Sequence, residues 1–208
     1  MILSDREIRA AVNRGAVGFT GLPTEPRRWS STTVDLTLDA EVRVWQKRES
    51  VGEEEALVNP ALPEFNANAI IERYTEPHYC DREDVIIEPR RMVLGWTVER
   101  IKLPHHSRIG ARVEGKSSLA RIGLGIHVTA PTIHPGFGVD PRKPKYPGSP
   151  IRLEIWNCGE LRIRLTKGMA ICQLIFEYVD GAPEEGYTGQ HAVQGPPPVQ
   201  RPQRRVGR

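Results

Sequence analysis

The residues with the clearest chemical potential lie in the stretch VEGKSSLARIGLGIHVTA, residues 113–130. Lys116, Ser117, Ser118 and Arg121 place two cations and two hydroxyl groups within six residues, directly before an apolar run. Phosphate oxygens accept several hydrogen bonds at once and attract cations, so this composition fits an anion site, above all one for a phosphate chain. The spacing is not that of a P-loop. The alternative is a solvated polar turn between two strands.

A carboxylate follows in the stretch IRLEIWN, residues 151–157. Alternation puts Glu154 on one side of a predicted strand, together with Arg152 and Trp156. The aliphatic side chains lie on the other side: Ile151, Leu153 and Ile155. Glu154 is therefore either an acidic residue on a solvated sheet face or a carboxylate that lines a cleft beside the anion site and acts as a general base.

Two other kinds of chemistry do not fit the spacing. Zinc nucleobase deaminases use H-x-E with P-C-x-x-C, whereas no His here is followed at +2 by Glu and no two cysteines are separated by two residues. We interpret the pair His105-His106 as solvated loop residues and expect no zinc site. The G-x-S-x-G motif of a serine hydrolase is also absent.

Composition narrows the class of protein. The 208 residues, 38% hydrophobic and 26% charged, suffice for one globular domain with a tail. The net charge of +3 is small, and four arginines fall in residues 201–208, so we do not expect a nucleic-acid binder. The chain has no apolar stretch of roughly 20 residues and no leader, so we expect no membrane span and no secretion. Three widely spaced cysteines indicate reduced thiols in a cytoplasmic protein.

Short strands dominate the elements that must position these groups. A helix is predicted for about residues 5–14, with Ser4 and Glu7 forming a capping box. Residues 32–45 alternate as a half-buried strand, residues 91–104 form a strand with a bulge near Glu99, and residues 169–179 form a central strand. A hairpin is predicted around residues 158–160, and residues 46–82 are expected to be loops around one or two short strands. This pattern is typical of a barrel or sandwich.

Two segments are too rich in Gly, Pro and charge to form a core. Residues 136–150 must form a loop. Residues 181–208 contain almost no aliphatic side chains and are predicted to be a flexible C-terminal tail, which leaves residues 1–180 as the folded domain.

Several stretches together resemble the dCTP deaminase branch of the deaminase/dUTPase superfamily over residues 1–190. They occur in the order MILSDREI, VDLTL, EPRRMVLGWTVERIKLP, ARVEGKSSLARIGLGIHVTA, PGF, IRLEIWN and KGMAICQLIFE. The resemblance implies a mainly β fold, a distorted β-barrel or jelly-roll of the dUTPase-like type with a short N-terminal helix. It also implies a homotrimer with active sites between subunits, and Mg²⁺ bound with the nucleotide triphosphate rather than by protein side chains.

The resemblance assigns roles to individual residues. Glu154 matches the catalytic glutamate, which activates water without zinc. The triphosphate-binding stretch is matched by Lys116, where the family usually has Arg, and by Ser117, Ser118, Leu119, Ala120 and Arg121. The backbone at Thr129 and Ala130 positions the base and the water. Tyr187 and Gln190 resemble a C-terminal lid. The remaining substrate-binding positions are His134, Arg152, Leu153 and Gln173.

Some positions depart from the family pattern. His134 stands where an acidic residue usually contacts the deoxyribose, Thr132 replaces an arginine, and Gly186 replaces a lysine. An insertion, here called the insertion loop and defined as residues 138–150, precedes the Glu154 strand. Its cations Arg142, Lys143 and Lys145 either replace a missing phosphate contact or are simply solvated.

Three functions therefore stay open. The first is hydrolytic deamination of dCTP to dUTP and ammonia. The second is a dUTPase, or a bifunctional enzyme that forms dUMP and pyrophosphate, although His134 counts against a pure dUTPase and Asp140 would have to substitute. The third is a non-catalytic nucleotide-binding regulator.

Overall fold

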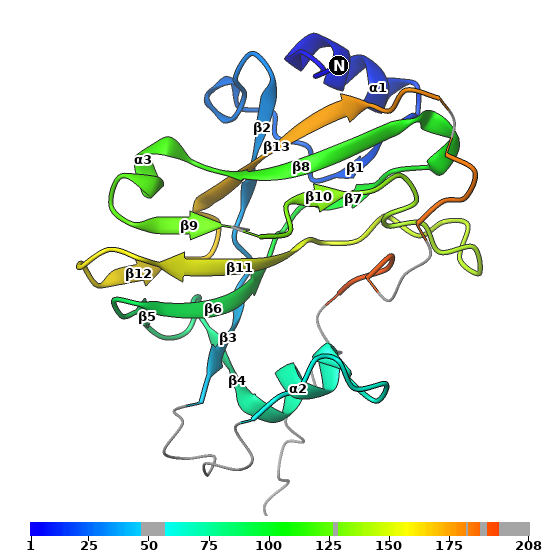
Figure 1. Cartoon of the computed structure of the whole chain (residues 1–208). Coiled ribbons are helices and arrows are strands. Elements are labelled where there is room, and N and C mark those ends of the chain that lie inside the picture. The colour runs from blue at the N-terminus through cyan, green and yellow to red at the C-terminus, as the bar shows by residue number, and fades with distance from the viewer. Residues whose placement is uncertain (47–56, 127–128, 182, 188–190, 196–208) are drawn as a thin grey trace, which may run out of the picture.

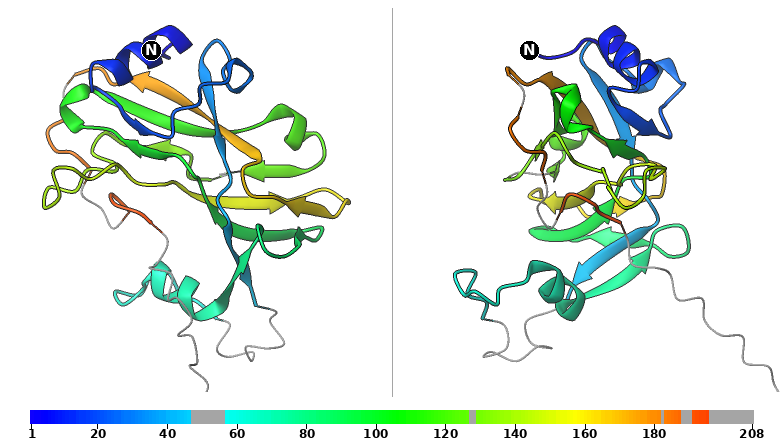
Figure 2. Two further views of the ribbon diagram at one scale, coloured as in Figure 1. Left: turned by 180° about the vertical axis from the view of Figure 1, so that it is seen from behind. Right: turned by 90° about the vertical axis from the view of Figure 1, so that its right-hand side faces the viewer.

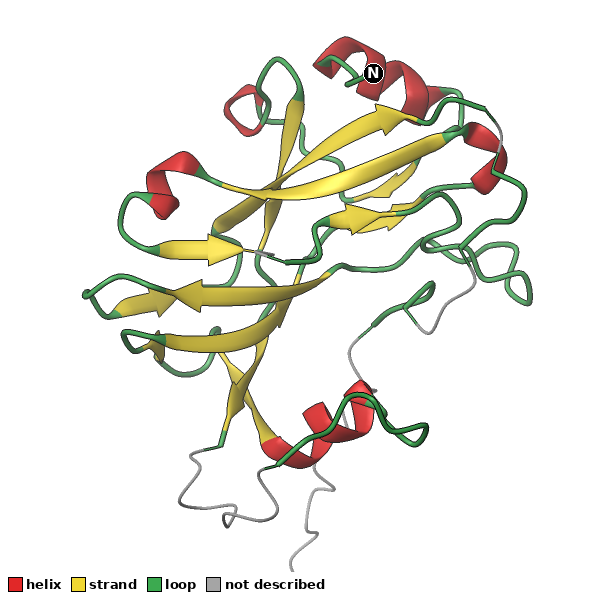
Figure 3. Ribbon diagram, in the orientation of Figure 1, coloured by secondary structure: helices red, strands yellow, loops and turns green. Residues whose placement is uncertain are grey.

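The computed structural model describes residues 1–46, 57–126, 129–181, 183–187 and 191–195. Strands dominate these residues, and the helices are few and short, as Figures 1 and 3 show. The mainly β class with a short N-terminal helix, predicted from the sequence, is confirmed. The described strands form two larger sheets and two small ones rather than one closed barrel.

The first large sheet contains the long apolar strand near the end of the domain. Its strands, in spatial order, are β10 (Thr132–Ile133), β8 (Ile109–Gly115), β13 (Ala170–Tyr178) and β2 (Thr33–Thr37). All neighbours are antiparallel. β13 has a partner on both edges, which confirms its predicted central position.

The second large sheet carries the Glu154 strand. Its strands, in spatial order, are β4 (Thr75–Tyr79), β3 (Glu41–Trp45), β6 (Arg91–Trp96), β11 (Arg152–Asn157) and β9 (Leu124–Ile126). The small sheets pair β1 (Gly18–Thr20) with β7 (Arg100–Lys102), and β5 (Val85–Ile87) with β12 (Ile163–Leu165). Figure 2 shows how the sheets stack along the molecule from α1 to α2.

One hydrophobic core joins the two large sheets. It receives side chains from the four-stranded sheet, such as Leu36 and Phe176, and from the five-stranded sheet, such as Leu153 and Ile155, each 0% exposed. In β11 and β13 these buried residues alternate with less buried ones, whose side chains lie on the outer faces of the sheets.

The N-terminal helix forms as predicted. α1 covers Asp5–Asn13, and the Ser4 hydroxyl accepts a hydrogen bond from the Glu7 backbone N–H at 3.3 Å. Ile8 and Ala11 on its inner face are fully buried. Gly15, with φ of +74°, follows the helix, since a left-handed residue ends an α-helix at little steric cost.

Four predictions about the elements were wrong. Residues 67–74 form a helix, α2 (Ala67–Tyr74), because the Asn66 side chain caps the N–H of Ala69. β2 is buried on both faces, since Lys116 pairs with Asp35 and the hydroxyls of Thr33 and Thr37 are hydrogen-bonded inside the subunit. The chain around Glu99 does not bulge: it leaves one sheet after Trp96 and joins another at Arg100. Strands β11 and β12 are consecutive but do not pair, because each finds an earlier strand.

The remaining short elements are turns of helix: η1 (Pro26–Arg28), η3 (His105–Ser107) and α3 (Ser117–Ala120). Part of the loop predicted within residues 46–82, residues 47–56, lies outside the described residues.

Candidate functional site

Glu154 lies on the outer face of the five-stranded sheet. Its inward neighbours Leu153 and Ile155 are 0% exposed, which confirms the alternation predicted from the sequence. In the antiparallel register with β6, Glu154 lies opposite Leu94 and Arg152 lies opposite Trp96. Directly opposed residues share a face, so a carboxylate, a guanidinium and an indole meet outside the core.

A cavity of about 600 Å³ lies over this face. Its walls come from the sheet, from α2, from the segment that leads into β10, and from Tyr187, His191 and residues 193–195 near the end of the chain. The lining includes five residues predicted for the site: Ala130, His134, Arg152, Glu154 and Tyr187. It also includes Trp96, Glu72 and Gln194, which the sequence did not point to. The cavity is large enough for a nucleoside.

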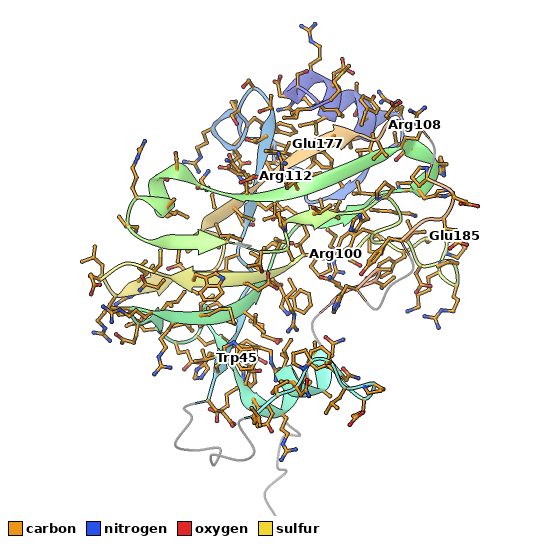
Figure 4. All side chains as sticks on the ribbon, viewed as in Figure 1. Trp45, Arg100, Arg108, Arg112, Glu177 and Glu185 are labelled. Atoms are coloured by element: carbon orange, nitrogen blue, oxygen red, sulfur yellow. The ribbon has the colours of Figure 1, made fainter. Side chains whose placement is uncertain are left out.

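A cluster of charges supports the floor of this cavity. The Arg43 guanidinium lies 3.1 Å from a Glu72 carboxylate oxygen and 3.9 Å from one of Glu41, and its Nε donates to the Thr75 hydroxyl at 2.8 Å. Burial raises the pKa of Glu41, an effect that the charges of Arg43 and Arg152 oppose. Trp45, at the end of β3 beside the start of β4, is labelled in Figure 4.

Arg152 lies two residues before Glu154 on β11. Its guanidinium stacks on Trp96, 4.2 Å from the ring centroid, and its buried Nη1 has no hydrogen-bond partner among the described residues. Burial and the charge of Arg43 lower the pKa of Arg152, while Glu41, Glu72 and Glu154 act in the opposite direction. This partly desolvated cation and Glu154 lie on the same face of β11 and line the same cavity.

The predicted phosphate motif lies elsewhere on the same subunit. Ser117, Ser118 and Arg121 are exposed on and after α3, and none of residues 116–121 lines the cavity. α3 is followed by β9. All three residues of β9 pair with the end of β11 that is remote from Arg152. Lys116 is held by Asp35, at 2.5 Å between Nζ and Oδ2. One subunit therefore does not bring the motif to Glu154.

Four further predicted residues have mixed placements. Both ends of the Gln173 carboxamide are engaged inside the subunit, with the Gly115 carbonyl and the Thr33 hydroxyl, each at 3.1 Å. Leu153 points into the core, so only its backbone is available to a ligand. Thr129 is exposed, and Gln190 lies outside the described residues.

The described parts of the predicted tail lie against the cavity. The Tyr187 N–H donates to the Pro135 carbonyl at 2.9 Å, and its ring lies 5.5 Å from that of His134. The Gly138 N–H donates to the carbonyl of Ala192 at 2.6 Å. The division of the chain into a domain and a flexible tail stays a prediction.

The described residues show neither a metal-binding cluster nor a membrane-spanning helix. No three side chains of His, Cys, Asp and Glu among them are grouped so as to hold a metal ion. No described helix has the length and apolar character needed to cross a bilayer. On the outside of the four-stranded sheet Arg112 pairs with Glu177 at 3.1 Å, and both are labelled in Figure 4.

The cavity-lining residues that were not predicted have only weak signals in the sequence. Asn66 before ANAIIERY is a standard helix start, so α2 and its Glu72 were open to prediction. Trp96 lies on the same predicted strand face as the apolar Leu94. The sequence therefore indicated a core residue at this position and not a cavity residue. Gln194 lies in a stretch without periodicity and could not have been found locally.

Comparison with known proteins shows to which family the chain belongs. The model of the dCTP deaminase-like family matches residues 2–179. A protein of Corynebacterium efficiens named "dCTP deaminase, dUMP-forming" is 31% identical over 187 residues, covering 90% of this chain and 84% of the relative. A protein of the same name from Thermobifida fusca is 34% identical over 187 residues, covering 90% and 83%.

A solved structure supports the fold. The 2'-deoxycytidine 5'-triphosphate deaminase from Agrobacterium tumefaciens superposes with a TM-score of 0.57 over 85% of this chain, at 18% sequence identity. The chain spans about half of that protein, 48% of its length. At this identity the likeness concerns the arrangement of strands.

Proposed function

Because the chain belongs to the dCTP deaminase-like family, we propose that it hydrolyses dCTP and releases ammonia, with dUMP and pyrophosphate as the final products. The names of the relatives favour dUMP over dUTP as the end point, so the bifunctional alternative replaces simple dUTP formation as the leading hypothesis. The observation that supports the proposal most directly is the position of Glu154 in a cavity of nucleoside size, beside a partly buried cation.

Glu154 is the proposed proton carrier. Water adds to C4 of the cytosine ring while Glu154 accepts one of its protons, and the same carboxyl group then protonates the amine. The C4–N bond breaks, ammonia leaves and uracil remains. A glutamate on a strand that is paired along its length is a rigid mount, so the carboxylate is held at one position relative to the base.

Arg152 is the proposed positioning residue for this step. Its guanidinium is fixed by stacking on Trp96, and it shares the outer face of β11 with Glu154. The backbone at Ala130, on the opposite wall, is proposed to hold the base and the water. Tyr187 and His134, whose rings lie together, are proposed to cover the sugar.

A complete site requires a second subunit in this proposal. The cation and hydroxyl motif of Lys116, Ser117, Ser118 and Arg121 is exposed and absent from the cavity lining. A homotrimer with sites between subunits would bring this motif from one copy to Glu154 of the next. The substrate is then the magnesium complex of dCTP, in which the phosphate oxygens hold the ion.

Cleavage to dUMP needs a second water, which attacks the α-phosphorus and expels pyrophosphate. Asp140, considered from the sequence as the acidic group for this step, does not line the cavity. Its carboxylate accepts the Arg142 N–H at 3.0 Å inside the insertion loop. This arrangement supports a structural role for Asp140.

Product analysis tests the reaction. The protein is incubated with Mg²⁺ and dCTP, and separately with Mg²⁺ and dUTP, and the nucleotides are separated by chromatography. The proposal expects dUMP, pyrophosphate and ammonia from dCTP. Accumulation of dUTP would mean that the protein only deaminates dCTP. Nucleotide binding without turnover would favour a non-catalytic nucleotide-binding regulator.

Two matched substitutions test the role of Glu154. Glu154→Gln is expected to abolish deamination while nucleotide affinity stays within about tenfold, or roughly 1.4 kcal/mol. Glu160→Gln, an exposed residue in the turn after β11, is the control and keeps full activity. An active Glu154→Gln protein would remove the basis of the mechanism.

Mixed oligomers test whether sites are shared. Glu154→Gln and Arg121→Met are each expected to be inactive alone. Co-folded at equal amounts, they regain about a quarter of wild-type activity, because some interfaces pair an intact Glu154 with an intact Arg121. The control mixes Glu154→Gln with the double variant and stays inactive. Failure to recover activity in the first mixture would contradict intersubunit sites.

A further inference from the structure

Among the described residues, β11 has a partner strand along the whole of one edge and along only part of the other. β6 pairs with the whole strand from Arg152 to Asn157. On the other edge β9 pairs only with Ile155, Trp156 and Asn157. Residues 127–128, which follow β9, lie outside the described residues, and among the described ones no strand pairs with this edge over residues 152–154.

A side chain from residues 191–195 accepts a hydrogen bond from the backbone of β11 on this edge. The backbone N–H of Arg152 donates to Oε1 of Gln194 at 3.1 Å. The donor is therefore two residues from the proposed catalytic carboxylate, and Gln194 and Glu154 line the same cavity.

Gln194 is held from several directions at once. Its own N–H donates to the Ser149 hydroxyl at 2.9 Å, and its carbonyl accepts from the Tyr146 hydroxyl at 3.3 Å. Two residues earlier the Ala192 carbonyl accepts from Gly138. All three partners belong to the insertion loop, residues 138–150, so this loop is the dock for residues 191–195.

The dock is itself fixed to the fold. Ser149 and Ile101 exchange both backbone hydrogen bonds, at 2.8 and 2.9 Å. Gly138 and Gly148, with φ of +70° and +101°, approach the Ile101 carbonyl so closely that a Cβ would lie 2.0 and 2.6 Å from its oxygen. A rigid dock places the Gln194 carboxamide at one position on the strand edge.

A carboxamide and a cytosine edge offer similar groups. The glutamine side chain presents a carbonyl acceptor next to an NH₂ donor. Cytosine presents the ring acceptor N3 next to its exocyclic NH₂ donor, and O2 is a further acceptor. Either acceptor can take the hydrogen bond of the Arg152 N–H.

We propose that the Gln194 carboxamide is an internal substitute for the pyrimidine and that it occupies the base subsite until nucleotide displaces it. This inference rests on the proposed function, since it takes the base to lie beside Glu154. The contact is autoinhibitory: each binding event must first release Gln194, so the apparent dissociation constant exceeds that of the open site. The insertion loop thereby sets nucleotide affinity without touching nucleotide.

Binding measurements test the competition. Affinity for dCTP with Mg²⁺ is measured by calorimetry on the full chain in the Glu154→Gln background, which prevents turnover. Gln194→Ala is expected to tighten binding by roughly threefold to tenfold, the effect of losing one net hydrogen bond to the competitor. Tyr146→Phe, which loosens the dock at a different atom, shifts affinity in the same direction by less. Gln46→Ala, the same change at an exposed residue that follows β3 and does not line the cavity, leaves affinity unchanged.

Hydrogen exchange tests the contact without nucleotide. Gln194→Ala is expected to speed exchange of the Arg152 amide in the free protein, and dCTP to restore its protection. Unchanged exchange, or equal or weaker dCTP binding by Gln194→Ala, would overturn the inference while leaving the proposed function in place. If dCTP and dUTP bind to no variant, the proposed function fails and the competition is refuted with it, whatever the exchange in the free protein.

Discussion

Removal of the Glu99 carboxylate is expected to be the most damaging single charge deletion in this fold. Glu99 is 2% exposed. It accepts hydrogen bonds from the Thr37 N–H at 2.8 Å, the Thr37 hydroxyl at 2.9 Å and the Arg28 guanidinium at 2.8 Å. Glu99→Ala leaves both Thr37 donors unpaired in a buried site and removes the counter-ion of Arg28, whose Nη2 keeps only the Asp35 carbonyl as acceptor.

The magnitude follows from this geometry. Loss of one partner of a buried ion pair costs about 3–5 kcal/mol, and because the Arg28 side chain is 17% exposed the lower end applies. At the usual unfolding entropy per residue, a loss of about 3 kcal/mol lowers the melting temperature by about 7 °C for a chain of this length. Glu99→Gln keeps one acceptor oxygen and is expected to fall between wild type and Glu99→Ala.

Denaturation followed by circular dichroism at one protein concentration measures the effect, since association would make the transition concentration-dependent. Glu160→Ala, whose carboxylate is 80% exposed, is the control and changes stability by less than about 0.5 kcal/mol. In a double-mutant cycle, Glu99→Ala and Arg28→Ala together should cost less than the sum of the two. A loss below about 1 kcal/mol for Glu99→Ala, or strict additivity, would refute the reasoning.

Three further predictions concern the helix, the cavity floor and the dock. Ser4→Ala removes the cap of α1 and is expected to lower the free energy of unfolding by about 1 kcal/mol in thermal denaturation; no change would mean that the cap contributes nothing. The pKa of Glu41 is raised by burial, so the native state binds the proton more tightly than the unfolded chain, and stability declines as the pH rises from about 4.5 through the raised pKa. Urea titrations across pH should show this decline in wild type and a smaller one in Glu41→Gln, and equal slopes would contradict the assignment. Gly138→Ala drives a Cβ into the Ile101 carbonyl and is expected to cost more than about 1 kcal/mol and to raise proteolysis of the insertion loop, whereas Gly168→Ala, with no atom within 4 Å, is the positive-φ control.

Local patterns in the sequence were sufficient for some elements of the fold. The cap at Ser4 and the apolar positions Ile8 and Ala11 specify α1 within a few residues. The apolar run of β13 required a strand with partners on both edges. In β11 the alternation already separated Glu154 from the core. Each of these features depends on neighbours within about ten residues, which is the range over which period and capping act.

Long-range pairing was not accessible in the same way. β11 and β12 are separated by a short turn, yet β11 pairs with β6 and β12 with β5. The choice depends on which register buries the most apolar surface across a whole sheet, and no short window contains that information. Glu99 was misjudged for the same reason: its partners, Arg28 and Thr37, come from a distant part of the chain.

The amino-acid sequence by itself determined the chemical groups: two cations and two hydroxyl groups at residues 116–121, a carboxylate at Glu154, and the strand faces that display them. Only the tertiary structure decided which of these groups meet. It joined Glu154 to Trp96, Glu72 and Gln194, and it left the motif on another part of the subunit surface. The physical reason is that hydrogen-bonding and packing preferences are local and strong for a helix or a strand edge, whereas the burial that assembles a cavity is non-directional and is settled by the whole chain at once.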